Sequence, residues 1–408
     1  MVTSHVTQKK TNYHNNLSPT PLSFKCFNLE IDKMEHVQFQ NMHLISYGVF
    51  SNVYYGSIIN PIKKQVAIKN TWVDKRCATG KNVIELETVK ELKILSLLRK
   101  GKHKNLIMLY YCFRIIPKHG NKRCISMVFE YMPFNLHQII SKNKKPLSDF
   151  DIKLYTWQLF RAQNYMEQLC IAHRDIKPHN ILVDPVSGLL KVGDFGSSKL
   201  IESGSKSLSY NVTRYYRPPE LLLGSEKYNI RIDVWSCGCV MGEMMKGNIL
   251  LRGKNTNDQM RLIYECLGEL SIEDIEIMKI NKEKKEILDN EEGILKAISL
   301  GNLKKKDDVN PYKHLFPQNV NKDLIKLLKK VLVYNPNKRL SGSKFLQNKI
   351  FRELFEKDVK RNDKPFTLLT RDDLIDGIDG DVKCLQRTVE SATISLNLSQ
   401  EIKNNEQH

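Results

Sequence analysis

The pattern of hydrophobic and polar positions divides the chain into two parts of different character. From residue 38 to residue 132, short β-branched and apolar runs predominate. They predict strands at residues 37–46, 53–59, 65–73, 106–115 and 124–132. Residues 84–98 differ, because Leu92, Leu95 and Leu98 recur at helical spacing. The first part is therefore predicted to be a small β-rich lobe with one helix.

After residue 132 the pattern becomes helical. Apolar residues spaced three and four apart between Ile152 and Leu169 predict an amphipathic helix, and Ser148 precedes it as a candidate N-cap. Further apolar segments predict helices at residues 232–245, 324–333 and 344–354, the last of which is expected to be the final helix. Residues 133–356 are therefore predicted to form a larger, mainly helical lobe.

Three segments lack a clear apolar pattern. Residues 1–37 are rich in Ser, Thr, Asn and Lys and are expected to be a mobile tail. Residues 269–308 are densely charged, which favours a solvated insertion over a charge-specific binding site. Residues 357–408 are polar again and are expected to form a peripheral C-terminal extension.

The charge balance narrows the class of partner. The 408 residues are 41% hydrophobic, and 64 Lys and Arg against 45 Asp and Glu give a formal net charge of +19. Such an excess can serve nucleic acids, acidic membranes or anionic proteins. Because the basic residues are spread among many loops, phosphorylated or acidic protein substrates, or simple solubility, are favoured, and no nucleic-acid partner is expected.

The cysteines and the apolar runs bear on the compartment. The nine cysteines form no C-x-x-C pair, which favours reduced thiols over a disulfide or zinc framework. No apolar run approaches transmembrane length, and the N-terminus has no signal-peptide pattern. We expect a cytoplasmic protein, with the nucleus as a further location, and no membrane association.

Two short motifs carry the strongest chemical signal. Residues 173–180 read His-Arg-Asp-Ile-Lys-Pro-His-Asn, and residues 194–196 read Asp-Phe-Gly. This order and spacing are typical of the catalytic and metal-binding loops of a protein kinase. An unreactive turn between buried strands is the structural alternative to each motif alone, but not to both together.

Phosphoryl transfer explains the residue types in these motifs. Asp175 would orient the attacking hydroxyl and accept its proton, and Lys177 would offset charge on the moving phosphoryl group. Asn180 and Asp194 would supply hard oxygen ligands to Mg²⁺. The motifs therefore predict an enzyme that uses ATP and Mg²⁺.

The nucleotide also requires a lysine on a strand and a carboxylate on the following helix. Residues 66–69, Val-Ala-Ile-Lys, make Lys69 the candidate for contacting the phosphates. Glu85, Glu87 and Glu91 compete as its ion-pair partner. Glu91 is preferred because the leucines that follow it fit the core-facing side of the helix.

The loop over the phosphates is the weakest part of the pattern. It would fall on residues 46–53, after Ile45, and of the three expected glycines only Gly48 is present. Glycines in such a loop allow the backbone to approach phosphate closely, and serine occupies the other two positions. Gly48 could equally be an ordinary turn glycine.

An adenine site can be placed by register with these motifs. Backbone groups of Glu130 and Met132 would pair with the base, and Phe129 would partly close the pocket behind it. Val53, Ala67 and Leu182 would contact its faces, although all three are also ordinary core residues.

Residues 194–199, Asp-Phe-Gly-Ser-Ser-Lys, and 209–220, Ser-Tyr-Asn-Val-Thr-Arg-Tyr-Tyr-Arg-Pro-Pro-Glu, resemble glycogen synthase kinase-3. The resemblance covers about residues 38 to 356. It implies an α+β fold, the bilobal eukaryotic protein kinase fold, with serine/threonine kinase activity. Cyclin-dependent and MAP kinases usually have Trp-Tyr-Arg where this chain has residues 215–217, Tyr-Tyr-Arg.

The same resemblance implies further roles. Tyr210 would be the activation-loop tyrosine that is phosphorylated. Lys90, Arg174 and Lys199 would bind a phosphate already present on the substrate, giving a preference for S/T-x-x-x-pS/T sequences. Lys90 stands where the family has Arg, and so keeps the charge but loses the bidentate fork. Glu220 would form a buried ion pair with Arg339.

The chain also departs from the family. The glycine loop is incomplete, Pro218 replaces the usual Ala, and the 269–308 region, where family members bind scaffold helices, is expanded. Scaffold proteins therefore remain a general expectation, with no particular partner implied. The alternative functions are a pseudokinase scaffold and a kinase of the cyclin-dependent type.

Overall fold

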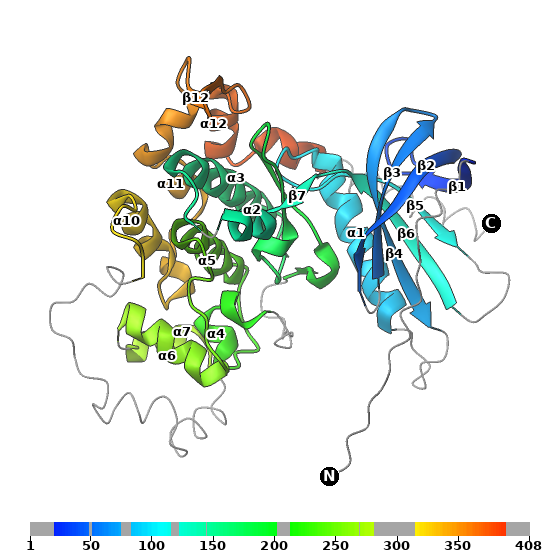
Figure 1. Ribbon diagram of the computed structural model, residues 1–408. Coiled ribbons are helices and arrows are strands. Elements are labelled where there is room, and N and C mark those ends of the chain that lie inside the picture. Colours follow the sequence, from blue (N-terminus) through cyan, green and yellow to red (C-terminus); the bar gives the residue numbers. More distant parts are fainter. Residues whose placement is uncertain are drawn as a thin grey trace, which may run out of the picture. The chain divides into compact units, whose positions relative to one another are not determined.

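The β-rich part of the chain folds as one antiparallel sheet in the computed structural model (Figure 1). Its strands follow the order β1 (Leu22–Asn28), β2 (Lys33–Tyr47), β3 (Ser51–Asn60), β4 (Lys64–Asp74), β6 (Lys122–Glu130) and β5 (Leu109–Ile115). The sheet curls, so that Phe27 and Asn28 of β1 also pair with β5. The five strands predicted from the sequence are confirmed.

The structure describes residues 20–48, 51–74, 83–115, 122–143, 145–201, 213–268, 270–280 and 315–388. The chain forms two compact units, of which the first comprises Met1–Thr88 and Met108–Tyr131, and the second Val89–Ile107 and Met132–His408. The division passes through helix α1 (Val83–Gly101).

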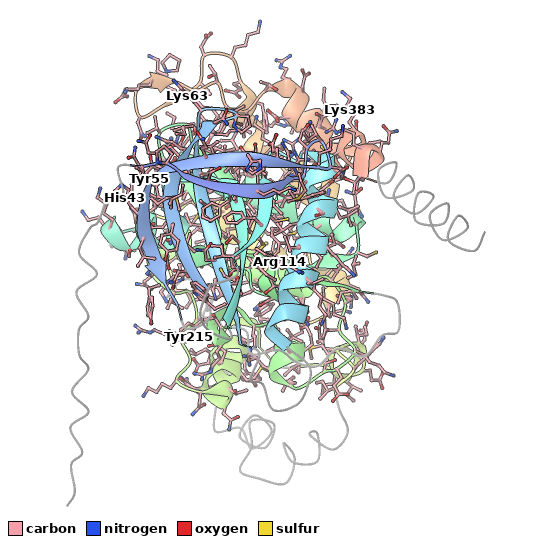
Figure 2. The ribbon with its side chains drawn as sticks, turned by 90° about the vertical axis from the view of Figure 1, so that its right-hand side faces the viewer. His43, Tyr55, Lys63, Arg114, Tyr215 and Lys383 are labelled. Carbon is pink, nitrogen blue, oxygen red and sulfur yellow. The ribbon has the colours of Figure 1, made fainter. Side chains whose placement is uncertain are left out.

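One face of the sheet holds the core of the first unit. Phe24 stacks on Phe113 with ring centroids 4.7 Å apart, and the buried side chains are aliphatic and aromatic, as alternation along the strands requires: Cys26, Val37, Phe39, Ile58, Val66, Ile68, Tyr111, Phe113 and Val128. On β2 and β3, His43 and Tyr55 are cross-strand neighbours with nearly parallel rings 6.3 Å apart (Figure 2).

The predicted mobile tail is wrong for residues 20–37. This stretch forms β1 and the first third of β2, and Cys26 and Val37 are fully buried. The signal was the alternation of Leu22, Phe24 and Cys26, which is hidden among polar neighbours. Pairing with β2 satisfies the backbone of β1, which its composition alone did not suggest. Residues 1–19 lie outside the described part of the chain.

The second unit is mainly helical. Besides the end of α1, the helices that the structure describes in this unit are α2 (Leu136–Asn143), α3 (Asp149–Gln168), α4 (Pro219–Leu222), α5 (Ile232–Lys246), α6 (Thr256–Leu267), α7 (Ile272–Ile277), α10 (Lys322–Val331), α11 (Gly342–Leu346) and α12 (Arg371–Ile378). Helix α3 is almost entirely buried, and Phe160 on it stacks on Phe345 of α11 at 3.7 Å. Ser148 caps α3 by accepting the Asp151 backbone N–H, which confirms the predicted cap.

Short strands in this unit position the loops between the helices. Strand β9 (Ile181–Asp184) pairs with β10 (Leu189–Val192) and with β7 (Phe134–Asn135). Strand β8 (Ile171–Ala172) pairs with β11 (Lys199–Leu200). The candidate catalytic loop therefore begins and ends in β-structure.

The C-terminal part of the sequence prediction needs two corrections. The helix predicted at 344–354 is α11 followed by a separate 3₁₀ segment (Lys349–Phe355), and α12 follows later. The extension that was expected to be peripheral forms a hairpin, β12 (Lys360–Arg361) with β13 (Lys364–Pro365), and buries Asp381 and Thr388. From the sequence, its charged side chains were expected to be solvated, because the residues they pair with lie more than 200 positions away.

Of the predicted 269–308 insertion, only residues 270–280 are described, and α7 starts there with a capping box between Ser271 and Asp274. The eight cysteines in the described part of the chain are all free thiols. Within that part, no helix has the length and apolar character needed to cross a bilayer.

Candidate active site

The loop from β8 to Asn180 is held in place by a buried carboxylate. Asp233, in the first turn of α5, accepts the backbone N–H of His173 at 2.6 Å and that of Arg174 at 2.9 Å. Arg174 has a positive φ of 65°, so the loop turns sharply there. Burial raises the pKa of Asp233 despite these donors. The sequence analysis missed Asp233, although a lone carboxylate opening an apolar helix was a usable signal.

His173 joins the two motifs. Its Nδ1 accepts the backbone N–H of Asp175 at 3.3 Å, so the proton is assigned to Nε2, which donates to the carbonyl of Gly193 at 3.0 Å. The ring, which is fully buried, meets Phe195 edge-on at 4.9 Å. A neutral histidine thus connects the catalytic loop to the residues on both sides of Asp194.

Asp175 lies at the centre of a polar cluster. Its Oδ2 accepts Lys177 Nζ at 2.7 Å and Asn180 Nδ2 at 2.9 Å. Lys177 Nζ also lies 3.3 Å from the Thr213 hydroxyl, which brings the activation segment to the loop. The other oxygen, Oδ1, is buried and has no hydrogen-bond partner among the described residues. One oxygen is therefore used to orient the carboxylate, and the other can accept a proton from a bound group.

Asn180 and Asp194 offer oxygen atoms close to this cluster. The amide nitrogen of Asn180 donates to Asp175, which leaves its carbonyl oxygen as a potential ligand. Asp194 is exposed, with a positive φ of 58° that turns it out of the chain after Gly193, whose N–H donates to Asn180 O. No three His, Cys, Asp or Glu side chains gather as a metal cage in the described part of the chain. These two oxygens suit Mg²⁺, which commonly takes one or two protein ligands and completes its shell with phosphates and water.

Two of the three predicted phosphate-binding cations lie at one pair of neighbouring strands, Lys199 on a strand and Arg174 just after its partner strand. Lys199 of β11 is opposite Ala172 of β8. Arg174, two residues after Ala172, donates Nε to Ser197 O at 2.6 Å and Nη1 to the Tyr228 hydroxyl at 3.2 Å. Lys90 is on α1 in the same unit and is exposed. Tyr210 lies outside the described residues.

Three nucleotide-binding candidates of the first unit lie on the neighbouring strands β3 and β4. Lys69 on β4 is opposite Val53 on β3, and Ala67 is two residues before Lys69, on the same face. Gly48 donates its N–H to Ser51 O at 2.9 Å, and Ile45 is 55% exposed. Residues 49 and 50 of the candidate phosphate loop are outside the described part.

Glu130 ends β6, where its N–H donates to Met108 O at 3.0 Å and its carboxylate accepts the Met108 N–H at 2.7 Å. Glu130 N–H is therefore already used, and only its carbonyl could serve adenine. Met132, Leu182 and Glu91 belong to the second unit, in which Glu91 is only 5% exposed. The side chains of Glu85 and Glu87, the competing carboxylates, lie outside the described part.

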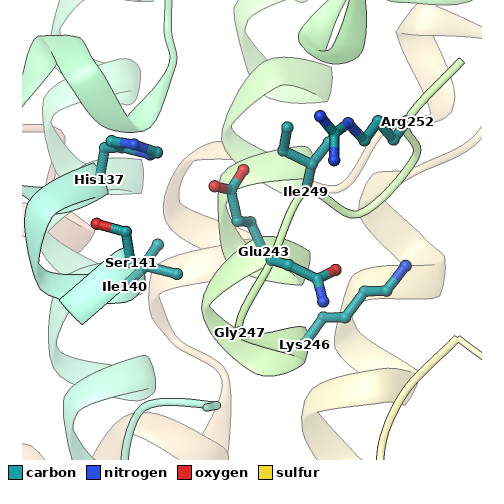
Figure 3. A pocket seen from close by; sticks show the side chains of 9 residues that line it. His137, Ile140, Ser141, Glu243, Lys246, Gly247, Ile249 and Arg252 are labelled. Atoms are coloured by element: carbon teal, nitrogen blue, oxygen red, sulfur yellow. The ribbon is translucent and has the colours of Figure 1, made fainter. Parts of the chain in front are cut away.

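A pocket of about 520 Å³ lies between α2 and the end of α5. Figure 3 shows His137 of α2 and Glu243 of α5 on opposite walls. Glu243 accepts the Tyr216 hydroxyl at 2.7 Å, and burial raises the pKa of its carboxyl. His137 stacks at 4.0 Å on His179, which precedes Asn180. The pocket therefore adjoins the catalytic loop; the sequence analysis named none of its residues.

Comparison with known proteins gives a consistent result. Residues 39–351 match the protein kinase domain family. The chain is 38% identical over 248 residues to the putative serine/threonine-protein kinase gskl-1 of Caenorhabditis elegans, an alignment covering 60% of this chain and 65% of that protein. It is 31% identical to the protein kinase gsk3 of Schizosaccharomyces pombe over 80% of this chain and 78% of that one. It is 33% identical to the serine/threonine-protein kinase RIM11/MSD1 of Saccharomyces cerevisiae, over 81% and 82% of the two chains.

Proposed function

Because this chain belongs to the protein kinase family, and within it to the glycogen synthase kinase-3 group, we propose that it phosphorylates protein Ser and Thr residues that lie four positions before an existing phosphate. The relatives include named serine/threonine-protein kinases. The family match also confirms the expected α+β fold, with a β-rich N-terminal lobe and a helical C-terminal part.

The observation that carries the catalytic part of the proposal is Oδ1 of Asp175, which is buried and has no hydrogen-bond partner within the described ranges of the chain. The substrate hydroxyl donates to Oδ1, and its proton passes to that oxygen as its own oxygen bonds to the γ-phosphorus of ATP and the bond from that phosphorus to ADP breaks. Lys177 and Asn180 hold Oδ2, so the carboxylate cannot rotate away. Lys177 also contacts Thr213, so this arrangement depends on the activation segment, the stretch from Asp194 to Glu220.

The family implies the use of ATP. We assign Lys69 and its proposed partner Glu91 to the phosphates, and Ile45, Val53, Ala67 and Leu182 to the faces of the adenine. The carbonyl of Glu130 and the backbone of Met132 pair with the edge of the base, and Gly48 closes the phosphate loop. Asn180 and Asp194 would hold Mg²⁺, which neutralises charge on the transferred group when bound.

The preference for a phosphorylated substrate is supported by three cations. Lys199 lies on β11, Arg174 follows β8, the strand that pairs with β11, and Lys90 lies on α1. Arg174 donates through two of its nitrogens to Ser197 and Tyr228, which fixes the plane of the guanidinium group. A doubly charged phosphate would receive charge-assisted hydrogen bonds here.

Matched peptides test the preference. Lys90→Ala, Arg174→Ala and Lys199→Ala should each lower kcat/KM for a peptide phosphorylated at position +4 by about tenfold or more, the value of one charge-assisted hydrogen bond. The unphosphorylated peptide should be affected much less. Lys326→Ala, at an exposed lysine of α10, is the matched charge control and should change neither rate.

Equal losses on both peptides would contradict the preference while leaving kinase activity intact. Failure of the unmodified protein to transfer phosphate to either peptide with Mg-ATP would contradict the activity itself and favour a scaffold.

A further inference from the structure

The C-terminal segment 368–388, here called the C-terminal clamp, is joined to α3 by a buried charge cluster. Arg161 of α3 donates Nε and Nη2 to Asp381 Oδ1, at 3.0 and 2.6 Å, and Nη1 to Asp373 Oδ1 at 2.8 Å. Asp381 and Arg161 are 1% and 5% exposed. Hydrogen bonds from His103 and Arg161 hold the pKa of Asp381 below its ordinary value although burial opposes this. Asp381 is therefore ionised, and both of its oxygens accept hydrogen bonds, Oδ1 from Arg161 and Oδ2 from His103.

His103, two residues after the end of α1, approaches the same carboxylate from the other side. Its Nε2 lies 3.2 Å from Asp381 Oδ2, and its Nδ1 accepts the backbone N–H of Asn105 at 3.2 Å. These contacts assign the proton to Nε2 and make the ring neutral. The ring stacks on Tyr165 of α3 with centroids 4.6 Å apart. The clamp thus reaches the turn that follows α1.

The clamp also closes the end of α1 directly. Arg387 donates to the Gly101 carbonyl at 2.7 Å, one of the terminal carbonyls that have no partner within a helix. Lys104 donates to Asp373 at 2.9 Å and to Leu368 O at 2.6 Å. A side chain at Gly101 would overlap the Tyr165 hydroxyl and come within 2.7 Å of Thr388 Oγ1. The close fit therefore requires glycine.

The turn held by the clamp leads on to the metal-binding motif. The Asn105 side chain donates to Leu190 O at 2.9 Å, and Asn105 O accepts the Val192 N–H at 2.9 Å. The Ile107 N–H donates to Val192 O at 3.0 Å. Val192 ends β10, two residues before Asp194. One short turn is thus bonded to the C-terminal clamp, to α1 and to the strand that presents Asp194.

We propose that the C-terminal clamp is a positioning element for catalysis, in which Asp381 and Arg161 set the placement of α1, with its Glu91, and of β10, with Asp194. Glu91 is ten residues before Gly101, which is about 15 Å along a rigid helix. A shift at the clamped end is therefore transmitted to Glu91. The proposal rests on the proposed function, because the roles of Glu91 and Asp194 are part of it.

A pair of isosteric variants separates positioning from stability. Asp381→Asn removes the charge that joins α3 to the turn after α1. Asp151→Asn removes the charge opposite Arg361, another ion pair between α3 and the C-terminal extension, at 2.7 Å, with the two side chains 18% and 7% exposed. Asp151 is at the far end of α3 from the clamp. Both variants should lower the unfolding midpoint in urea.

Only Asp381→Asn should change the kinetics. We expect its kcat/KM for ATP to fall about 10- to 100-fold, as for a small misplacement transmitted to reacting groups. KM for the peptide should stay unchanged, and α1 amides should exchange hydrogen faster. Kinetics equal to those of the unmodified protein, or to those of Asp151→Asn, would overturn the proposal.

Gly101→Ala provides a second variant that alters no charge. Its added methyl group would collide with the Tyr165 hydroxyl and with Thr388 of the clamp, and should reproduce the fall in kcat/KM for ATP. This keeps the proposal testable if Asp381→Asn does not fold. Unchanged ATP kinetics in a folded Gly101→Ala protein would also overturn it. The unmodified protein serves as the reference throughout. If it is inactive the proposed function fails, whereas an active reference with kinetically silent clamp variants contradicts only the clamp.

Discussion

Two clusters in the helical unit each centre on an aspartate that accepts hydrogen bonds from basic side chains, but they differ in how many of the carboxylate oxygens have a donor. In the catalytic cluster, Asp175 accepts hydrogen bonds from Lys177 and Asn180 through one oxygen, and the other is buried with no partner among the residues that the structure describes. In the C-terminal clamp, Asp381 receives Arg161 on one oxygen and His103 on the other. We call the first cluster open, because one carboxylate oxygen lacks a donor among the described residues, and the second closed, because both carboxylate oxygens have donors.

The difference agrees with the catalytic role proposed for Asp175. A buried acceptor without a donor costs about 1–3 kcal/mol, so it is expected mainly where a ligand supplies the donor. A closed cluster of buried charges gains little net stability, because desolvation offsets attraction. Such a cluster instead fixes the relative positions of its side chains, because removing one charged partner leaves the other buried and uncompensated.

The largest expected effect comes from the open acceptor. Asp175→Asn should lower kcat about 10²- to 10⁴-fold, because the amide cannot take the hydroxyl proton. The urea unfolding midpoint should fall little, since the amide oxygen can still accept the two donors that hold the side chain. Steady-state kinetics and denaturation on the same preparation measure both. An unfolded variant would mean that this cluster is structural like the clamp.

The closed cluster should respond in the opposite way. Arg161→Met should destabilise the protein by about 3–5 kcal/mol, because Asp373 and Asp381 lose their shared counter-charge in a buried site. The control is Lys153→Met on the same helix, whose partner Glu353 is 41% exposed.

That half-exposed pair should be worth less than about 1 kcal/mol. The free energy of unfolding from urea titrations gives both values. Equal losses would remove the distinction between the closed cluster and an ordinary ion pair.

The smallest effect concerns pH. Burial lowers the pKa of His103 despite Asp381, with Arg161 and Lys191 adding to the lowering. The unfolded chain therefore binds a proton near pH 6.5 that the folded chain does not, and this term makes stability fall as the pH drops below that value.

His103→Asn cannot titrate, so its free energy of unfolding should lose that part of the pH dependence. Urea titrations at pH 5.5 and 7.5 measure it. The same slope in both proteins would show that His103 does not contribute. Stability linked to Asp381 has a separate window, because its lowered pKa places the loss below the ordinary aspartate range.

The catalytic loop was predictable because its contacts are local. Asp175, Lys177 and Asn180 lie within six residues, so the spacing itself brings them together once the loop turns. The N-cap of α3 was predictable for the same reason. The Glu220–Arg339 pair spans 119 residues, with both oxygens bonded at 2.7 Å, and it was anticipated only through resemblance to a family.

Strand β1 and the C-terminal clamp were not predictable, for a physical reason they share. Each is a polar stretch whose stability comes from a distant partner, β2 and β5 in one case and α3 and the end of α1 in the other. Asp381 and Arg387 look solvated in the sequence, since charged side chains usually are.

The amino-acid sequence by itself determined the candidate chemistry of this protein, because motifs of three to eight residues contain the groups that phosphoryl transfer requires. Only the tertiary structure decided that the carboxylate of Asp381 has donors on both oxygens, whereas that of Asp175 has described donors on one. His103 and Asp381 are 278 residues apart, and they meet at a carboxylate to which Arg161 of α3 also donates. Desolvation and pairing depend on all three segments at once, which no local pattern encodes.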